Sequence, residues 1–296
     1  MQLDQEALRT DLSVIILTHN EQANLAQALD SVSGWAKQVF IVDSFSSDGT
    51  VEVATRYGCK IFQFRFEGFP EQRNRALREL PIETEWVLFL DADEWLPDEL
   101  KAEITAKLRE KPAANGFFLR RRFYWMGAWV RRGYYPVWIL RLFRHGRAYC
   151  EDRSVNEHMV LEGAADFLRE DFIHQDRKPV SEWIEKHNRY AVKEARELFR
   201  AQSEPAKLAA RFFGAQAERT RWLRERIYNR LPPIVRPFLF FGYRVIVCGG
   251  ALDGWRAVLY HFLQAFWYPL LIDVNFLEES KQERLSLSHE HSFSSR

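Results

Sequence analysis

The sequence feature that most constrains the fold is an apolar run that ends in a cluster of acids. Residues 86–90, Trp-Val-Leu-Phe-Leu, are typical of a buried strand, and Asp91, Asp93 and Glu94 follow closely. Acids at the carboxyl end of a buried strand lie where open α/β sheets bind ligands. Their oxygen atoms suit Mg²⁺ or Mn²⁺ bridging a diphosphate. The alternative is a solvated turn before the next helix, because residues 97–99, Pro-Asp-Glu, resemble a helix start.

Strands and helices are predicted to alternate over about the first 100 residues. The expected strands are 12–17, 39–42, 60–64 and 86–90, and the expected helices are 24–32, 51–57 and 71–80. This alternation predicts an α/β fold, a mostly parallel sheet flanked by helices and joined by right-handed crossovers. The ligand should lie at the carboxyl ends of the strands, which carry Thr18, Asp43 and the acids at 91–94.

Charge is nearly balanced over the chain but uneven along it. The formal net charge of +1 gives no general attraction for nucleic acid, so we expect no nucleic-acid partner. Residues 117–150, however, hold eight arginines and no Asp or Glu, interleaved with aromatic side chains. We expect strands and a loop that flank the site there, with arginines that contact anionic groups. A plain solvated face is the alternative.

The three cysteines are odd in number and far apart, which argues against a disulfide framework and against a thiolate metal site. A reducing compartment is therefore expected. The N-terminus carries Asp4 and Glu6 before its first apolar run, so we expect neither a signal peptide nor a transit peptide.

Four motifs, in this order, resemble those of the family 2 glycosyltransferases, the inverting type with a GT-A fold. They are Ser-Val-Ile-Ile-Leu-Thr-His-Asn-Glu at 13–21, Ile-Val-Asp-Ser-Phe-Ser-Ser-Asp-Gly-Thr at 41–50, Gln-Arg-Asn-Arg-Ala at 72–76 and Leu-Phe-Leu-Asp-Ala-Asp-Glu-Trp-Leu at 88–96. The resemblance covers about residues 11–160. Within the family the chain looks most like the branch that includes lipopolysaccharide-core glucosyltransferases. That narrower likeness is carried by Asp-Ala-Asp-Glu at 91–94, Val-Asn-Glu-His at 155–158 and Lys-His-Asn-Arg-Tyr at 186–190.

The resemblance implies a site for a nucleotide-sugar donor. The residues implied around base and ribose are Thr18, Asn20, Glu21 and Asp43. Arg73 and Asn74 are implied on the nucleotide side. Asp91 would face ribose or metal-bound water. An Asp carboxylate can accept a hydrogen bond from the uracil N3–H. Asp93 would ligate Mg²⁺ or Mn²⁺ between the phosphates. Apart from the resemblance, Arg141 is the member of the arginine-rich stretch that we expect to contact a phosphate or the acceptor.

One departure from the family concerns the second strand end. The family commonly shows two acids in succession there, whereas Asp43 is followed by Ser44. The contacts to the base and to the ribose are therefore open to a different distribution among the site residues than in the family. Asp48 is either a binding residue or a turn residue before Gly49.

An inverting transfer needs a carboxylate that takes the proton of the acceptor hydroxyl as its oxygen attacks the sugar. Glu157 is the candidate base, because its segment resembles a His-Glu-His segment of related enzymes, although Asn156 replaces the first His. The acids at 151–152 are rivals. His158 is either a contact to metal or diphosphate or a structural group, and His174 has the same two interpretations.

The chain is expected to divide into a catalytic domain, a helical extension, an apolar aromatic-rich segment and a disordered polar tail. The expected boundaries are 1–175, 176–231, 232–277 and 278–296. Charged residues and prolines interrupt the apolar segment, so it does not form a clean membrane span. Its aromatic and basic residues suit helices that lie in a bilayer interface. The alternative is a hairpin packed on the catalytic domain or on another subunit of a homo-oligomer.

These inferences describe a metal-dependent inverting glycosyltransferase. We expect it to pass a hexose from a UDP-sugar to a hydroxyl of a lipid-linked glycan in cell-surface polysaccharide or lipopolysaccharide biosynthesis, on the cytoplasmic face of the inner membrane. One alternative is a nucleotidyltransferase of the same fold, but residues 18–21, Thr-His-Asn-Glu, lack its Gly-rich loop. The other is a noncatalytic scaffold that binds nucleotide sugars.

Overall fold

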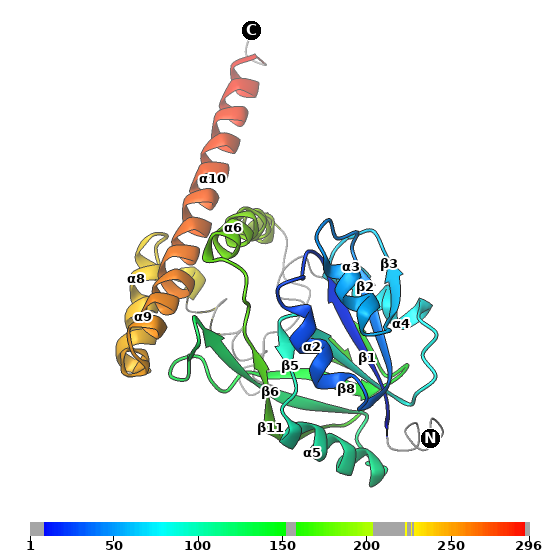
Figure 1. Ribbon diagram of the computed structural model, residues 1–296. Coiled ribbons are helices and arrows are strands. Elements are labelled where there is room, and N and C mark those ends of the chain that lie inside the picture. Colours follow the sequence, from blue (N-terminus) through cyan, green and yellow to red (C-terminus); the bar gives the residue numbers. More distant parts are fainter. Residues whose placement is uncertain (1–8, 152–157, 204–222, 224–225, 227, 294–296) are drawn as a thin grey trace. The chain divides into compact units, whose positions relative to one another are not determined.

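Figure 1 shows the computed structural model of the chain, which describes residues 9–151, 158–203, 223, 226 and 228–293. The chain forms two compact units, Met1–Lys178 and Pro179–Arg296. We call them the sheet unit and the helical unit, and each is described by itself.

Among the residues that the structure describes, the sheet unit contains all the strands and four helices. Its strands are β1 (Thr10–Thr18), β2 (Ala36–Asp43), β3 (Lys60–Gln63), β4 (Trp86–Asp91), β5 (Glu94–Trp95), β6 (Gly116–Trp125), β7 (Ala128–Trp129), β8 (Trp138–Arg144), β9 (Ala148–Cys150), β10 (Met159–Leu161) and β11 (Ala165–His174). Its helices are α2 (Leu25–Val32), α3 (Thr50–Arg56), α4 (Phe69–Glu79) and α5 (Asp98–Arg109). The expected alternation of strands and helices is confirmed.

The main sheet has nine strands in the order β3-β2-β1-β4-β8-β6-β11-β5, with β7 paired to β6. The neighbours from β3 to β4 are all parallel, which confirms the predicted parallel sheet over this half. Beyond β4 the sheet is mixed, because β8 runs antiparallel to both β4 and β6 while β11 is parallel to β6. The arginine-rich stretch provides most of β6 and all of β7, β8 and β9. β9 and β10 form a separate antiparallel pair.

The sheet separates two apolar cores because successive side chains of a strand point to opposite faces. Along β1, Val14 and Ile16 belong to one core, together with residues of α2 and α5 such as Leu29 and Ile104. Ile15 belongs to the other core, with Ala76 of α4 and Leu80, the residue that follows α4. All three β1 side chains are fully buried. The helices thus cover both faces and leave the carboxyl edge of the sheet open for polar residues.

The helical unit is built on a contact between two long helices. Its α-helices are α6 (Val180–Ser203), α8 (Val235–Gly242), α9 (Trp255–His261) and α10 (Tyr268–Phe293), with π-helical turns η2 (Tyr243–Val247) and η4 (Phe262–Trp267) and 3-10 turns η1 (Tyr228–Arg230) and η3 (Gly250–Asp253). Ala191 and Ala195 of α6 are fully buried against Tyr268 and Ile272 of α10. The Tyr268 hydroxyl also donates a 2.8 Å hydrogen bond to Glu194.

The tail expected to be disordered from 278 onward is instead helical, since α10 continues to Phe293. Residues 278–284, Glu-Glu-Ser-Lys-Gln-Glu-Arg, are mostly straight-chain residues with high helix propensity. At the start of this segment, Arg196 of α6 donates a 3.0 Å hydrogen bond to Glu279. In the described part of the tail, up to Phe293, the polar composition is therefore that of a helix.

Candidate active site

The register of the parallel strands brings three predicted site residues to one edge. Thr18 at the end of β1 pairs with Asp43 at the end of β2, and Leu17 pairs with Asp91 at the end of β4. Parallel strands end together, so polar residues from three separate motifs become neighbours. This edge is the candidate donor site.

Asp91 lies in a network of opposite charges. Arg141 of β8 donates from Nη2 to Asp91 Oδ2 and to Glu94 Oε1, both at 2.6 Å. Arg73 of α4 approaches Asp91 Oδ1 to 3.6 Å. Burial opposes ionisation of Asp91, but the charges of Arg141 and Arg73 outweigh it and hold the pKa of this carboxyl well below its usual range. Asp91 is therefore ionised at neutral pH.

Arg141 and Glu94 form the buried part of this network. Glu94 is fully buried and Arg141 is 7% exposed. Burial lowers the pKa of Arg141, but the charges of Asp91 and Glu94 raise it further above its usual range. Glu94 also accepts a 3.0 Å hydrogen bond from the backbone N–H of Asp91, and so it fixes the turn that carries the acids.

Asp93 faces His174 at the end of β11. His174 Nε2 lies 3.3 Å from Asp93 Oδ2, and His174 Nδ1 lies 3.5 Å from Glu94 Oε1. The antiparallel pairing of β11 with β5 places His174 opposite Glu94. The side chains of Asp93 and His174 are each 18% exposed, so both remain open to a ligand.

The Asp93 and His174 pair fits a divalent cation that is shared with a diphosphate. In the part of the chain that the structure describes, no group of three or more His, Cys, Asp or Glu side chains could hold a metal ion. A carboxylate oxygen and an imidazole nitrogen are ligands that Mn²⁺ accepts, and Mg²⁺ sites commonly combine one or two carboxylates with substrate phosphates. Asp93 and His174 would therefore hold such an ion only in part.

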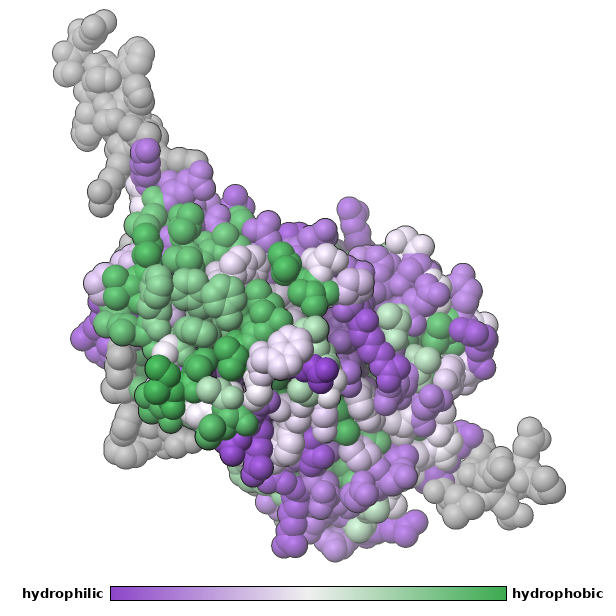
Figure 2. Space-filling model, turned by 60° about the vertical axis from the view of Figure 1, so that its left-hand side comes forward, coloured by the Kyte–Doolittle hydropathy of each residue, from purple (hydrophilic) through white to green (hydrophobic). Residues whose placement is uncertain are grey.

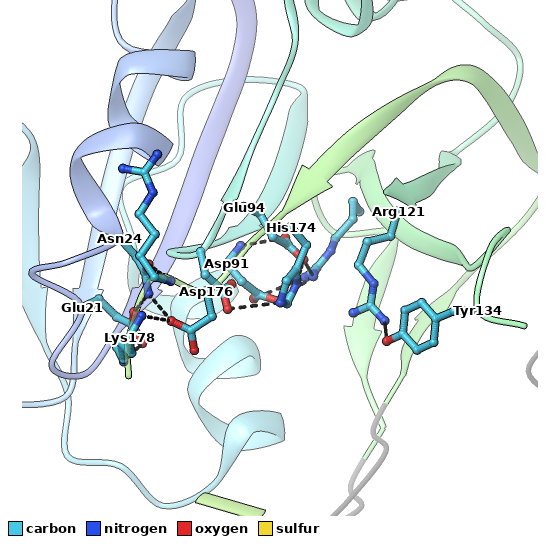
Figure 3. A network of polar contacts seen from close by, with 12 residues as sticks. Glu21, Asn24, Asp91, Glu94, Arg121, Tyr134, His174, Asp176 and Lys178 are labelled. Atoms are coloured by element: carbon cyan, nitrogen blue, oxygen red, sulfur yellow. Dashed lines mark hydrogen bonds and ion pairs between the residues drawn. The ribbon is translucent and has the colours of Figure 1, made fainter. Parts of the chain in front are cut away.

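The segment after β11 crosses the site and was missed by the sequence reasoning. Lys178 Nζ lies 2.5 Å from Glu21 Oε1, and Asp176 Oδ1 accepts a 2.9 Å hydrogen bond from Asn24 (Figure 3). The backbone N–H of Gln175 donates to the Asp93 carbonyl at 2.9 Å. The loop that follows β1 is thus connected through this segment to the acids that follow β4.

Glu21 is held by these contacts. Burial raises its pKa, and the charge of Lys178 opposes that rise. A second hydrogen bond of 2.8 Å comes from Asn24. Glu21 was predicted to lie near base and ribose, and its 20% exposed side chain keeps access to a ligand while it is tied to Lys178.

Asp43 supports the loop that follows its strand. The side chain is fully buried. Its oxygens accept hydrogen bonds from Thr18 Oγ1 at 3.0 Å, from Ser46 N at 2.9 Å and from Gln63 Nε2 at 3.2 Å. In this conformation Asp43 presents no exposed oxygen to a base. Its contact with uracil stays a prediction that requires Ser46 or Gln63 to move.

Asn20 and Asp48 connect the loops after β1 and β2. Asn20 Oδ1 accepts a 2.8 Å hydrogen bond from the Ser47 backbone. Asp48 accepts one from the Gln22 backbone and one from the Thr50 backbone, both at 3.1 Å. Burial raises the pKa of Asp48, but these hydrogen bonds lower it below its usual value. The contacts support the interpretation of Asp48 as a turn residue.

Asn74 of α4 holds the end of β9. Its Nδ2 donates to the Cys150 carbonyl at 2.9 Å, and its Oδ1 accepts from the Cys150 N–H at 2.8 Å. The amide that was predicted to face the nucleotide is therefore used by the backbone. In the sequence, β9 ends shortly before the segment that carries Glu157.

Glu157 and Asp152 lie outside the described residues. The residues on either side of this segment are paired with each other, since Glu151 Oε1 lies 3.1 Å from His158 Nδ1 and the Glu151 N–H donates to the His158 carbonyl at 3.0 Å. His158, which follows the segment in the sequence, is thus held next to Glu151, which precedes it. Its predicted contact with metal or diphosphate is not tested by this arrangement.

Part of the arginine-rich stretch is neutralised by one acid of β11. Asp171 is 6% exposed and lies 2.8 Å from Arg120 and 3.0 Å from Arg122. The Tyr135 hydroxyl lies 3.1 Å from the same carboxylate. These two arginines are therefore paired within the sheet unit. Arg141 is likewise paired with Asp91 and Glu94, and its contact with a phosphate or the acceptor stays a prediction.

Comparisons with known proteins agree with this geometry. Residues 13–159 match the sequence model described as Glycosyl transferase family 2. An uncharacterized glycosyltransferase of Rickettsia typhi is 39% identical over 93 residues, which are 31% of each chain. One of Rickettsia bellii is 38% identical over 99 residues, which are 33% of each chain. The chain therefore spans about a third of the length of these relatives.

Solved structures were also found, at low sequence identity. TarS residues 1–349 of S. aureus are 18% identical, with 92% of this chain and 91% of that chain covered and a TM-score of 0.45. The mannosyltransferase PcManGT from Pyrobaculum calidifontis, in complex with GDP-Man and Mn²⁺, is 16% identical, with 92% and 88% covered and a TM-score of 0.49. The four motifs and the family match show that residues 13–159 belong to the family 2 glycosyltransferases, and the mostly parallel sheet flanked by helices agrees with their GT-A fold.

Proposed function

We propose that the protein is a metal-dependent inverting glycosyltransferase that moves a hexose from a UDP-sugar to a hydroxyl of a lipid-linked glycan. The observation that carries the proposal is the open Asp93 and His174 pair beside the Asp91, Arg141 and Glu94 network, at the carboxyl edge of the sheet. This edge combines the oxygen and nitrogen ligands of a cation with guanidinium groups for phosphates.

The residues of the chain divide the work of such a reaction. Asp93 and His174 would hold the divalent cation, which supplies charge stabilisation to the departing diphosphate when bound. Arg73, whose side chain is 13% exposed, adds a positive charge on the same side. Asp91 stays ionised and orients Arg73 and Arg141.

Glu157 is the proposed general base. It would take the proton of the acceptor hydroxyl while that oxygen forms a bond to the anomeric carbon and the bond from that carbon to the diphosphate breaks. Attack from the side opposite the leaving diphosphate inverts the anomeric centre. The proton ends on the Glu157 carboxylate and the electron pair on the diphosphate.

The acceptor class and the location belong to the same proposal. The apolar, aromatic-rich helices between 234 and 277 expose many large apolar side chains, and this supports an acceptor carried on a lipid. We place the enzyme on the cytoplasmic face of the inner membrane, in lipopolysaccharide or other cell-surface polysaccharide biosynthesis.

The first test is donor binding by calorimetry with the full chain. UDP, GDP, CDP and dTDP are compared with and without Mn²⁺, on wild type, Asp93→Ala and the control Asp98→Ala. Asp98 is a suitable control because its side chain is 92% exposed on α5. We expect UDP to bind in a metal-dependent way that only Asp93→Ala weakens. Preference for another nucleotide contradicts the uridine assignment, and no binding by folded protein contradicts the donor site.

A further inference from the structure

The helical unit carries a large apolar surface. Twelve of the twenty exposed large apolar side chains of the described residues fall between 234 and 277. Figure 2 shows apolar side chains gathered on the side of the molecule where α8, α9 and α10 lie in Figure 1. We define the apolar face by its most exposed members, Phe238, Leu239, Ile246, Val247, Leu252 and Trp255. Exposed apolar surface of this extent marks an interaction site.

The spacing of the exposed residues makes the face continuous along the first helix. Val235, Phe238 and Leu239 of α8 and Tyr243 and Ile246 of η2 recur every three or four positions. Side chains at this spacing share one side of a helix. Ile246 is 79% exposed and Val247 is 74% exposed, so this side of the helix is apolar and faces outward.

Polar groups lie inside the same unit. Arg236 and Asp273 are 5% and 1% exposed, and their side chains form an ion pair in which Arg236 Nε donates to Asp273 Oδ1 at 2.8 Å. The sheet unit also buries an ion pair, Arg141 with Glu94, so a buried pair alone does not distinguish the helical unit. The helical unit differs in the number of large apolar side chains that stay exposed around its pair. Helices in contact with lipid combine paired ionisable groups inside with apolar groups outside.

The face also carries groups that suit the polar boundary of a bilayer. The Arg256 guanidinium lies 5.5 Å from the Trp255 ring centroid, and Arg244 lies 5.0 Å from the Phe240 ring centroid. Tryptophan and long basic side chains are typical at the headgroup level of membranes. The charged residues between 234 and 277 are Arg236, Arg244, Asp253, Arg256 and Asp273, an excess of one positive charge.

We propose that the apolar face binds the surface of an anionic lipid bilayer. This inference deepens the proposed function by naming the surface that brings the enzyme to a lipid-linked acceptor. The face lies in the bilayer interface with Arg244 and Arg256 among anionic headgroups. Its aliphatic side chains enter the acyl boundary.

The unit lies on the bilayer and does not cross it. Residues Trp255–Lys281 form the one described helical stretch that is long and apolar enough to span, with a mean hydropathy of 1.2 and 44% of the apolar window buried inside the protein. Within that stretch Asp273 is held by Arg236 in the interior of the unit.

The test is co-sedimentation of the full chain with vesicles, without nucleotide or acceptor. Neutral phosphatidylcholine vesicles are compared with vesicles that contain phosphatidylglycerol, at low and high salt. The variants are Ile246→Glu, Val247→Glu and the matched control Ile184→Glu, an isoleucine that is 38% exposed on α6. We expect stronger binding to anionic vesicles, weakened by salt, with each variant in the face binding about tenfold more weakly and the control unchanged.

Three outcomes overturn the proposal. The first is equal sedimentation of Ile246→Glu and wild type. The second is the absence of vesicle binding together with a dimer, measured by analytical ultracentrifugation, that Ile246→Glu dissociates; the face then binds a second copy. The third concerns extraction of the bound protein from the vesicles. If alkaline carbonate fails to release it and only detergent does, a helix spans the bilayer. None of these outcomes depends on donor binding, so failure here is distinguishable from failure of the proposed function.

Discussion

The sheet unit and the helical unit differ in what they expose, although each buries an ion pair, Arg141 with Glu94 and Arg236 with Asp273. The sheet unit places acids such as Asp93 at an edge that is open to ligands. The helical unit leaves large apolar side chains on its surface, and Ile246 is 79% exposed. The difference indicates two binding surfaces of different chemistry. One suits a charged nucleotide with its cation, and the other suits lipid.

The largest expected effect tests whether the polar edge is catalytic. Glu157→Gln removes the proposed base but keeps its shape, so we expect kcat to fall by about 10²–10⁴-fold while donor affinity stays unchanged. Turnover and calorimetric donor binding are measured on the same protein. Glu162→Gln is the control, because Glu162 is exposed and lies near the same segment. Full turnover by Glu157→Gln would remove Glu157 from the mechanism.

The second prediction tests the buried ion pair of the helical unit. Arg236→Met leaves Asp273 buried without its partner, which should lower the free energy of unfolding by about 3–5 kcal/mol. The double variant Arg236→Met, Asp273→Leu should recover most of that loss, since it removes both charges. Urea unfolding followed by helical circular dichroism measures both.

The control for this comparison is an exposed ion pair in the same unit. Arg196 and Glu279 are 3.0 Å apart, with side chains 61% and 35% exposed. Arg196→Met should therefore change the free energy of unfolding by about 1 kcal/mol or less. Equal effects of Arg236→Met and Arg196→Met would contradict the buried character of the first pair.

The third prediction concerns the pH at which each unit loses stability. His187 stacks on Trp183 with ring centroids 3.5 Å apart, and burial lowers the pKa of His187 from 6.5 to about 4. Between pH 4 and pH 6.5, His187 therefore binds more protons in the unfolded chain than in the folded one. Stability should fall as pH drops from 6.5 toward 4, by at most about 3 kcal/mol.

The Asp91 pKa leads to loss of stability in a different pH range. The Asp91 pKa is depressed below 3.8, so its contribution is present above that value and is lost only in stronger acid. We therefore expect the helical unit to weaken first, near pH 5. Unfolding of wild type, His187→Gln and the exposed-histidine control His145→Gln is measured at pH 7 and pH 5. An unchanged pH dependence in His187→Gln would assign the effect to another group.

The strands and the acids of the site were predictable because their signals are local. Apolar runs of strand length and the acids that follow one of them are visible in a single window, and Asp91 and Asp93 lie where this pattern places them. The roles of Glu94 and His174 were not predictable in the same way. They depend on the pairing of β5 with β11, which joins residues far apart in the sequence.

Other differences have the same origin. The contacts of Lys178 with Glu21 lie beyond the family motifs, and only the polar residues after an apolar run at 172–173 indicated a site there. The buried state of Asp43 depends on Gln63 from the neighbouring strand. Motifs therefore indicate which residues gather at the edge, while the partners of each residue follow from tertiary pairing.

The smallest expected effect decides between two roles for Asn74. The sequence places Asn74 on the nucleotide side, whereas the structure uses both ends of its amide on the Cys150 backbone. Asn74→Ala should lower the free energy of unfolding by about 1–2 kcal/mol, because it leaves two backbone groups without their partner. The Kd for UDP should change by less than about twofold, whereas kcat should fall because β9 leads toward Glu157. Asn115→Ala is the matched control, since Asn115 makes a single side-chain bond to the Glu162 carbonyl. A tenfold weaker Kd for UDP in Asn74→Ala alone would place Asn74 among the donor contacts, and the Cys150 bonds would then be exchanged for the nucleotide on binding.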